Sequence, residues 1–220
     1  MKTQEAILTG YKGISNCYDA LLSAQSMWAR LFCKLIWGFP IIAYADELLA
    51  WLPDDFVGKL LDVPVGTGQF TAAKYARMSG ASITCLDYSS DMMGKAQKRF
   101  ADAGLSNIKF TLGDVGALPF EDSAFDTVLS MNGFHAFPDK EAAYREIFRV
   151  LSPGGLFIGC FYVKGEKPRT DWFIKHFYVP RHYFTPPFET KDGVYNRLCE
   201  MYAEVEQKSV GGIVYFRCVK

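Results

Sequence analysis

The sequence predicts an α/β fold: a mostly parallel sheet of seven strands, with an antiparallel hairpin at the C-terminal end and helices on both faces. Two observations predict this class. Short apolar runs alternate with helical stretches between residues 59 and 163, as in the crossover units of a parallel sheet. The last two apolar runs flank Gly211 and Gly212, which is a hairpin signal. At 220 residues, half of them hydrophobic, the chain is expected to form one domain with a large core.

The N-terminal part, residues 1–57, is expected to be a helical cap. From residue 15 to 51, aromatic and aliphatic side chains recur at helical spacing with a break at Gly38 and Pro40, which predicts two or three helices. The first residues lack the pattern of a secretory signal, and the apolar run at 35–45 is far shorter than the roughly 20 residues of a spanning helix. We therefore expect no transmembrane segment and a cytoplasmic location.

Residues 58–163 are expected to form the core of the fold, with strands and helices in turn. Ser89 or Ser90 is the predicted cap of the second helix, which stops at Gly104. The Ser-Pro-Gly-Gly sequence at 152–155 is the predicted turn into the fifth strand. The predicted strands are 59–65, 82–87, 108–112, 125–131 and 156–163, and the predicted helices are 69–79, 89–103 and 139–150.

Residues 164–200, which we expect to be an insert on the substrate side, break this rhythm. Between 164 and 188, basic residues are interleaved with aromatic residues. Three interpretations are open: a nucleic-acid surface, a lid over an aromatic small molecule, and an amphipathic cap whose aromatic side chains fill the core. The terminal hairpin is then expected at 201–220, with strands at 203–209 and 213–219.

Charge and cysteine content narrow the possible partners. The 24 basic and 24 acidic residues balance, so no net field draws the protein to nucleic acid or to an anionic membrane. Any such partner must use a local patch. The six cysteines form no CxxC pair and have no histidine at metal-ligand spacing, which predicts neither a metal site nor a disulfide. Nothing in these patterns bears on oligomeric state.

A nucleotide site is predicted where the first strand of the core ends. Asp62 is followed by Gly66 and Gly68, which let the backbone approach a ligand at a helix N-terminus. Asp87 ends the second strand, 19 residues beyond Gly68, where a carboxylate can accept ribose hydroxyls. These features also fit an NAD-type oxidoreductase. Thr71 in place of a third glycine, and the carboxylate of Asp62 where a pyrophosphate would be repelled, favour a cationic ligand instead.

Further motifs follow this site in order. They are Gly113-Asp114 with Leu118-Pro119-Phe120, then Phe125-Asp126 through Asn132, His135, Phe137, Pro138 and Asp139, and finally the sequence at 149–155. Together with the first site, this order resembles the class I S-adenosylmethionine-dependent methyltransferases, in the branch that includes the quinone-biosynthesis enzymes. The resemblance covers residues 59–163 well and the flanks in outline. Pro64 departs from the pattern, since the family more often has glycine there and proline removes a backbone donor.

The resemblance implies a Rossmann-like sheet that binds S-adenosylmethionine and a small-molecule methyl acceptor. Asp62, with the backbone near Gly66 and Asn132, would hold the amino acid end of the cofactor, and Asp87 would hold its ribose. Gly68, in the same turn, is also expected to bind the cofactor. The sulfonium already activates the methyl group. The protein therefore mainly has to align donor and acceptor for an in-line displacement and to exclude water.

Two further cofactor contacts are implied. Asp114 with the N–H of Val115 would meet the adenine, and a plain turn aspartate is the alternative interpretation of Asp114. Tyr18 lies where members of the family often close over the cofactor, and an ordinary surface residue is the alternative there. A non-catalytic module that binds the cofactor remains a functional alternative beside the oxidoreductase.

His135 is the candidate catalytic residue. It follows the fourth strand, where the methyl group is expected, and an imidazole with a pKa near neutral can take a proton from a hydroxyl or thiol acceptor. The alternative is a structural histidine paired with a loop carbonyl. The residues after Asn132 lack the Asn-Pro-Pro-aromatic run of amino-directed nucleic-acid methyltransferases, so nucleic acid is not the expected partner.

Overall fold

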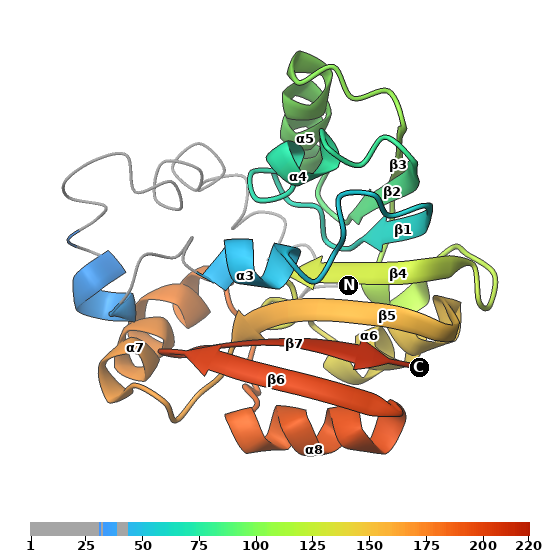
Figure 1. Cartoon of the computed structure of the whole chain (residues 1–220). Helices are drawn as coiled ribbons and strands as arrows, with labels where there is room; N and C mark the ends of the chain where they lie inside the picture. The colour runs from blue at the N-terminus through green and yellow to red at the C-terminus, as the bar shows by residue number, and fades with distance from the viewer. Residues whose placement is uncertain (1–30, 32, 39–43) are drawn as a thin grey trace.

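The computed structural model describes residues 31, 33–38 and 44–220, and a seven-stranded sheet forms its centre (Figure 1). The strands are β1 (Gly58–Asp62), β2 (Ala81–Asp87), β3 (Ile108–Leu112), β4 (Phe125–Met131), β5 (Leu151–Tyr162), β6 (Glu204–Val210) and β7 (Ile213–Val219). They lie in the order β3-β2-β1-β4-β5-β7-β6. The first five run parallel, and β7 is antiparallel to both β5 and β6. The predicted sheet and its terminal hairpin are confirmed.

Helices cover both faces of the sheet, which is why the parallel strands are apolar on both sides. Leu60 and Leu61 are adjacent in β1 and both fully buried, each in a different hydrophobic cluster. The helices that pack beside Leu60 are α3 (Ala45–Leu49), α4 (Ala72–Tyr75) and α5 (Ser90–Asp102), and those beside Leu61 are α6 (Lys140–Val150) and α8 (Lys191–Met201). In Figure 1, α3 lies in front of β5 and α6 behind it.

Capping residues set the first residues of the two long helices of the core. Ser89 caps α5, because its Oγ accepts a hydrogen bond from the N–H of Met92 at 3.3 Å, and Gly104 follows the helix with a φ of 71°. Asp139 caps α6 in the same way, with the N–H of Ala142 at 2.9 Å. The helices predicted at 89–103 and 139–150 are thereby confirmed.

The helix predicted at 69–79 is shorter than expected. Only 72–75 is α-helical, and the hydrogen bonds that follow tighten to three-residue spacing. The N–H of Arg77 donates to the carbonyl of Lys74 at 3.0 Å, and the N–H of Met78 donates to that of Tyr75 at 3.0 Å. These bonds turn the chain back toward β2 sooner than a full helix would.

Two other segments differ from the sequence-based expectation. β5 begins at Leu151 and continues through the turn predicted at 152–155, because its pairing register with β4 shifts there, between Phe125 and Thr127, as in a β-bulge. α8 was not predicted as a helix. Its Val194 and Leu198 are fully buried, so this last part of the expected insert packs against the sheet together with α6.

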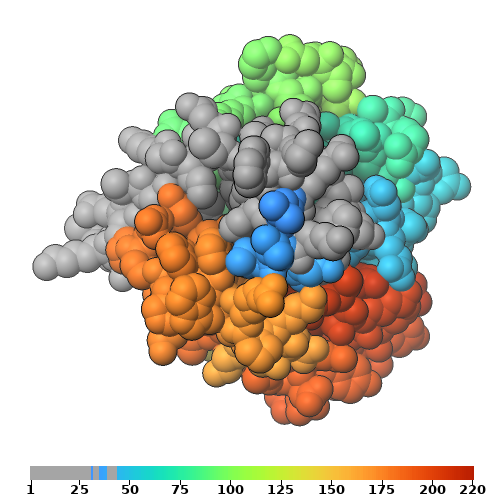
Figure 2. All heavy atoms as spheres, turned by 90° about the vertical axis from the view of Figure 1, so that its left-hand side faces the viewer, coloured from blue at the N-terminus to red at the C-terminus, as the bar shows by residue number. Residues whose placement is uncertain are grey.

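The remainder of the insert lies at the carboxyl edge of the parallel strands. It contains α7 (Pro168–Phe173), the π-helical turn η4 (Ile174–Tyr178) and the 3-10 turn η5 (Val179–Arg181). α7 contacts η1 (Cys33–Trp37), where Thr170 Oγ1 donates to the carbonyl of Ile36 at 2.6 Å. Figure 2 views the molecule from this side, with η1 in blue beside the orange insert.

Most of the expected N-terminal cap, including Tyr18, lies outside the described residues. Within the described part of the cap, the helical elements are η1 and α3. No helix in the described ranges is long and apolar enough to cross a bilayer.

Candidate functional site

A pocket lies at the carboxyl ends of β1, β2 and β4, where the strand order changes direction between β1 and β4. Open α/β sheets bind ligands at this position. The empty space at this pocket, including the part open to solvent, is about 1100 Å³. The predicted residues that line it are Asp62, Gly66, Gly68, Asp87, Asp114, Val115 and Asn132.

Asp87 holds two backbone segments of the pocket at once. Its Oδ2 accepts a hydrogen bond from the N–H of Gly66 at 2.8 Å, and its Oδ1 accepts one from the N–H of Ser89 at 2.8 Å. Burial raises the pKa of Asp87 to about 6, although the backbone donors oppose this shift. Each carboxylate oxygen has a second lone pair. The group can therefore accept hydroxyl donors from a ligand while it keeps both backbone bonds.

Asp62 is a buried carboxyl beside the neutral hydroxyl of Tyr75. The residue is 1% exposed, and burial raises its pKa to about 7. The hydroxyl of Tyr75, which donates to Oδ2 at 2.8 Å, opposes this shift, and the charge of Asp87 adds to it. A cation bound beside the two carboxyls would favour their ionised forms. The pair therefore favours a ligand with a positively charged group.

The two glycines of the turn have different surroundings. Gly66 and Gly68 both have positive φ, 57° and 68°. A Cβ at Gly66 would meet no atom within 4 Å, whereas a Cβ at Gly68 would lie 2.6 Å from the ring of Phe100 on α5. Glycine at 66 thus leaves space in the pocket, while glycine at 68 is required by helix packing. Gly68 also lines the pocket, so its contact with a ligand remains a prediction beside this packing role.

Asp114 and Asn132 are fixed parts of the pocket wall. Asp114 caps the short turn η3 (Val115–Ala117), because its Oδ1 accepts the N–H of Gly116 at 2.8 Å. The turn role is thus present, and contact with adenine remains a prediction. Asn132 has a φ of 57°, which is uncommon outside glycine, and its N–H donates to the carbonyl of Cys160 at 2.7 Å. Both residues have their backbone held before any ligand binds.

His135 is buried behind the pocket wall and is not among the lining residues. Its ring stacks on Phe184, with centroids 3.8 Å apart. Its Nδ1 accepts the backbone N–H of Tyr162 at 3.2 Å, so the proton of the neutral ring is on Nε2. Burial and then the charge of Lys140 lower the pKa of His135 to about 3. This geometry favours a structural histidine, with a backbone N–H in place of the expected carbonyl partner.

Three residues that the sequence analysis missed support the site from other elements. Tyr75 donates to Asp62, and the hydroxyl of Tyr44 donates to Oδ1 of Asn132 at 3.0 Å. Arg99 on α5 donates to the carbonyl of Thr67 in the glycine turn. Tyr75 and Arg99 lie in the helices predicted at 69–79 and 89–103, whereas Tyr44 lies in the expected N-terminal cap. Among the described residues, no group of three or more His, Cys, Asp or Glu side chains is placed to hold a metal.

Comparison with known proteins matches residues 60–155 to a family described as a methyltransferase domain. The chain is 37% identical over 100 residues to a demethylmenaquinone methyltransferase of Thermus thermophilus, a match that covers 46% of this chain and 45% of the relative. It is 35% identical over 133 residues to a ubiquinone/menaquinone biosynthesis C-methyltransferase of Brucella canis, covering 58% of this chain and 49% of the relative. The chain thus spans about half the length of these curated relatives.

A solved structure resembles the fold over nearly its whole length. It is a protein of Thermotoga maritima described as a SAM-dependent methyltransferase and possible histamine N-methyltransferase. Its TM-score is 0.69 at 18% identity, over 97% of this chain and 99% of that one. At 18% identity this comparison shows a shared fold and does not bear on the reaction.

Proposed function

From the match of residues 60–155 to a family described as a methyltransferase domain, we propose that the protein transfers a methyl group from S-adenosylmethionine to a small-molecule acceptor. The observation that carries the proposal is the pair of buried carboxyls, Asp62 and Asp87, in one pocket beside the open position at Gly66. S-adenosylmethionine has an ammonium, a sulfonium and two ribose hydroxyls, which are the groups that such carboxyls stabilise.

In this proposal the residues of the pocket bind the cofactor while they keep their own hydrogen bonds. Asp87 would accept the ribose hydroxyls on its remaining lone pairs, and Asp62 would face the ammonium. The backbone near Gly66, Gly68 and Asn132 would line the amino acid end of the cofactor. Asp114 with the N–H of Val115 would meet the adenine. A pyrophosphate beside Asp62 would be repelled, which argues against the oxidoreductase alternative.

When bound, S-adenosylmethionine supplies a methyl group already activated by the positive sulfur. The chain then has to orient the acceptor in line with that group and to keep water out. Phe137 and Pro138, in the loop after β4, give part of the pocket an apolar wall. His135 has its Nδ1 lone pair engaged and faces Phe184, so we propose that it positions this loop and takes no proton from the acceptor.

The names of the relatives suggest which methyl acceptors to test first. Their names place them in menaquinone and ubiquinone synthesis, so demethylmenaquinone and related quinone precursors are the first acceptors to test. The chain covers about half of each relative, and an acceptor of another class would leave the transfer reaction itself unchanged.

The test measures the melting temperature with S-adenosylmethionine, S-adenosylhomocysteine, NAD and NADP. A ligand that binds only the native state raises the melting temperature, and we expect this from the two sulfur compounds alone. Asp87→Asn should weaken S-adenosylhomocysteine binding by about 1.5–3 kcal/mol, the range for hydrogen bonds to a charged group. Stabilisation by a nicotinamide nucleotide, and by neither sulfur compound, would overturn the proposal.

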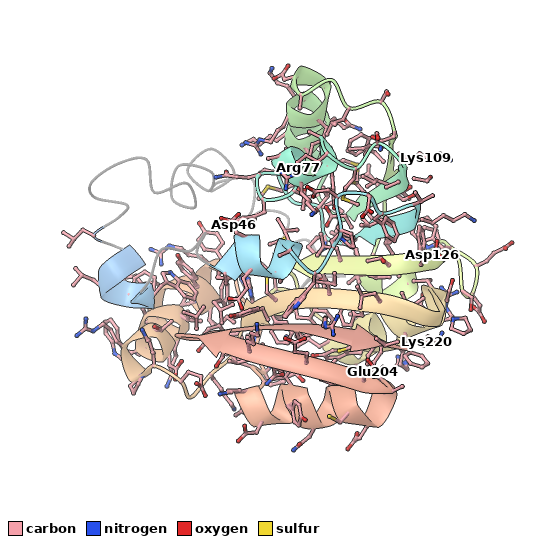
Figure 3. All side chains as sticks on the ribbon, viewed as in Figure 1. Asp46, Arg77, Lys109, Asp126, Glu204 and Lys220 are labelled. Carbon is pink, nitrogen blue, oxygen red and sulfur yellow. The ribbon has the colours of Figure 1, made fainter. Side chains whose placement is uncertain are left out.

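Asp126→Asn is the matched control. Asp126 Oδ2 also accepts a backbone N–H, that of Lys59 at 2.8 Å, but it lies at the opposite end of β4 from the pocket (Figure 3). Its variant should bind S-adenosylhomocysteine like the natural chain. Methyl transfer to quinone precursors, measured by product mass, then separates an enzyme from a module that binds the cofactor without turnover.

A further inference from the structure

The segment from α7 to η5 exposes large apolar side chains at the surface. Trp172 is 56% exposed and Phe177 is 39% exposed, while Leu35 on the adjacent η1 is 49% exposed and Leu31 is 44% exposed. Within the described part of the chain, these are four of the eight large hydrophobic side chains that are exposed. Gathered apolar exposure of this kind marks an interaction surface more often than scattered exposure does.

Contacts among these side chains hold the exposed rings in place. The ring of His176 stacks on Trp172 with centroids 4.8 Å apart, and Phe177 meets Trp172 edge-on at 5.8 Å. The guanidinium of Arg181 lies 5.9 Å from the centroid of the Phe177 ring. The rings are therefore already arranged on the surface before any partner is bound.

From Pro168 to Arg181 the same segment has three basic residues and one acidic residue, Asp171. Arg169, Lys175 and Arg181 are exposed, and no acidic residue occurs between Asp171 and Glu189. The carboxylate of Asp171 accepts the hydroxyl of Tyr162 at 2.6 Å and the N–H of Gly165 at 2.9 Å. Glu189 is paired with Arg197 at 3.0 Å. On a chain with zero net charge, this surface is a local basic patch.

We propose that this basic-aromatic surface, formed by Leu35, Arg169, Trp172, Lys175, Phe177 and Arg181, docks on a bilayer that contains anionic lipids. Short amphipathic segments with Trp, Phe and Leu among Lys and Arg lie in the interface of such a bilayer. Anionic headgroups complement the basic side chains, and the boundary of the acyl chains takes the apolar ones. The exposed leucines favour a bilayer over a single-stranded nucleic acid, which would stack on the rings alone.

The position of this surface relates it to the pocket. Both lie at the carboxyl edge of the sheet, because α7 follows β5 and β5 is parallel to β4. The insert also contacts the loop after β4, where the N–H of Thr185 donates to the carbonyl of His135 at 2.8 Å. Docking would therefore bring the pocket close to the membrane, where an acceptor dissolved in the bilayer is concentrated. This last step rests on the proposed function, whereas docking itself does not.

The test is flotation of the full chain, without cofactor, with vesicles of phosphatidylcholine alone or mixed with phosphatidylglycerol. We expect binding to the mixed vesicles and little binding to the neutral ones. The double variant Lys175→Gln/Arg181→Gln should weaken binding about fivefold for each charge removed. Trp172→Ala/Phe177→Ala should also weaken it, and brominated lipid should quench the fluorescence of Trp172.

Two variants away from the surface serve as controls. Tyr195→Ala removes an aromatic side chain of α8 that is 45% exposed. Lys109→Gln removes an exposed charge from β3, on the side of the molecule away from α7 (Figure 3). Both should float like the natural chain.

The proposal is overturned if the natural chain does not prefer the anionic vesicles, or if the surface variants bind as well as the controls. It is also overturned if a single-stranded RNA oligonucleotide binds more tightly than the vesicles and the same variants lose that binding. Stabilisation by S-adenosylhomocysteine, measured on every variant, confirms folding. A chain that docks on vesicles but binds no sulfur cofactor would refute the proposed function and leave the docking surface in place.

Discussion

At the scale of single residues, Asp62 and Asp87 should couple cofactor binding to proton release. Burial raises their pKa values to about 7 and about 6 in the ligand-free protein, so part of each is protonated near neutral pH. A bound cation favours the carboxylates, which lowers both pKa values. We predict that affinity for S-adenosylhomocysteine rises as the pH increases from about 6 to about 7.5 and then levels off. Titration calorimetry in buffers of different ionisation enthalpy measures the protons released.

Tyr75→Phe provides a variant for this prediction, because it removes the donor that favours the ionised form of Asp62. The pKa of Asp62 should rise further, and the pH at which binding levels off should rise with it. A binding heat independent of the buffer, in both proteins, would contradict the coupling.

His135 leads to a different prediction for its variant. Because its Nδ1 accepts a backbone N–H and its pKa is lowered to about 3, His135→Ala should reduce single-turnover methyl transfer less than tenfold. General bases usually contribute 10²–10⁴-fold. The same variant should lose about 1–3 kcal/mol of unfolding free energy in urea, because the N–H of Tyr162 is left without its acceptor. A loss of transfer above a hundredfold, with stability unchanged, would restore His135 as the base.

The residues of the pocket could be predicted from sequence alone, whereas most of the residues that hydrogen-bond to them or pack against them could not. The acids and glycines at the ends of the first two strands stand at characteristic spacings, so Asp62, Gly66 and Asp87 could be placed in one site. Tyr44 lies 88 residues from Asn132, and only the folded chain brings the two together. The surroundings of His135 likewise depend on Phe184 and Tyr162, which come from other elements.

At the scale of elements, the glycine turn separates a binding role from a packing role. Gly68→Ala should lower the unfolding free energy by roughly 1–3 kcal/mol, since the new Cβ overlaps Phe100 and the φ is positive. Adding Phe100→Leu should recover part of that loss. Gly66→Ala has the same backbone strain but open space around the Cβ, so its larger effect should be on cofactor affinity, measured by calorimetry.

Gly104→Ala is the matched control for this pair. Gly104 also has positive φ and open space, but it follows α5 away from the pocket lining. Its variant should show the cost of backbone strain with unchanged cofactor affinity. Equal losses of affinity in the Gly66 and Gly104 variants would show that the turn does not contact the ligand.

Elements with strong local signals were predictable, and those set by distant pairing were not. The serine and aspartate caps of α5 and α6 and the apolar runs of β1 to β4 fix those elements locally. The bulge at the start of β5 depends on the register of β4. α8 lacks a clear apolar stripe, and it becomes helical where Val194 and Leu198 meet the cluster beside α6.

At the scale of the whole molecule, the same titrating groups set the pH dependence of stability. Between about pH 5 and 7, the folded ligand-free protein keeps protons on Asp62 and Asp87, whose unfolded pKa values are near 4. This proton binding stabilises the folded state, and the stabilisation is lost as the pH rises. His135 acts in the opposite direction, because its lowered pKa makes its contribution fall as the pH drops below about 6.5. Between about pH 5 and 7, the stability that the two carboxyls lose as the pH rises is larger than the stability that His135 regains.

We therefore predict that the melting temperature of the ligand-free protein falls between pH 5 and 7. The increase caused by saturating S-adenosylhomocysteine should become larger over the same range, as the carboxyls gain their cationic partner. Scanning calorimetry at each pH, with and without the ligand, measures both trends. A ligand-induced increase that shrinks toward pH 7 would contradict the assignment of these carboxyls to the cofactor.

The bonds from Asp87 to the N–H groups of Gly66 and Ser89 also bear on how fast a ligand binds. They fix the turn after β1 and the first residue before α5 in the ligand-free protein, so little conformational entropy remains to be lost when a ligand enters. Association should then follow a single exponential whose rate increases linearly with ligand concentration, without the plateau that a slow ordering step would impose. Cofactor exchange would be governed by dissociation alone.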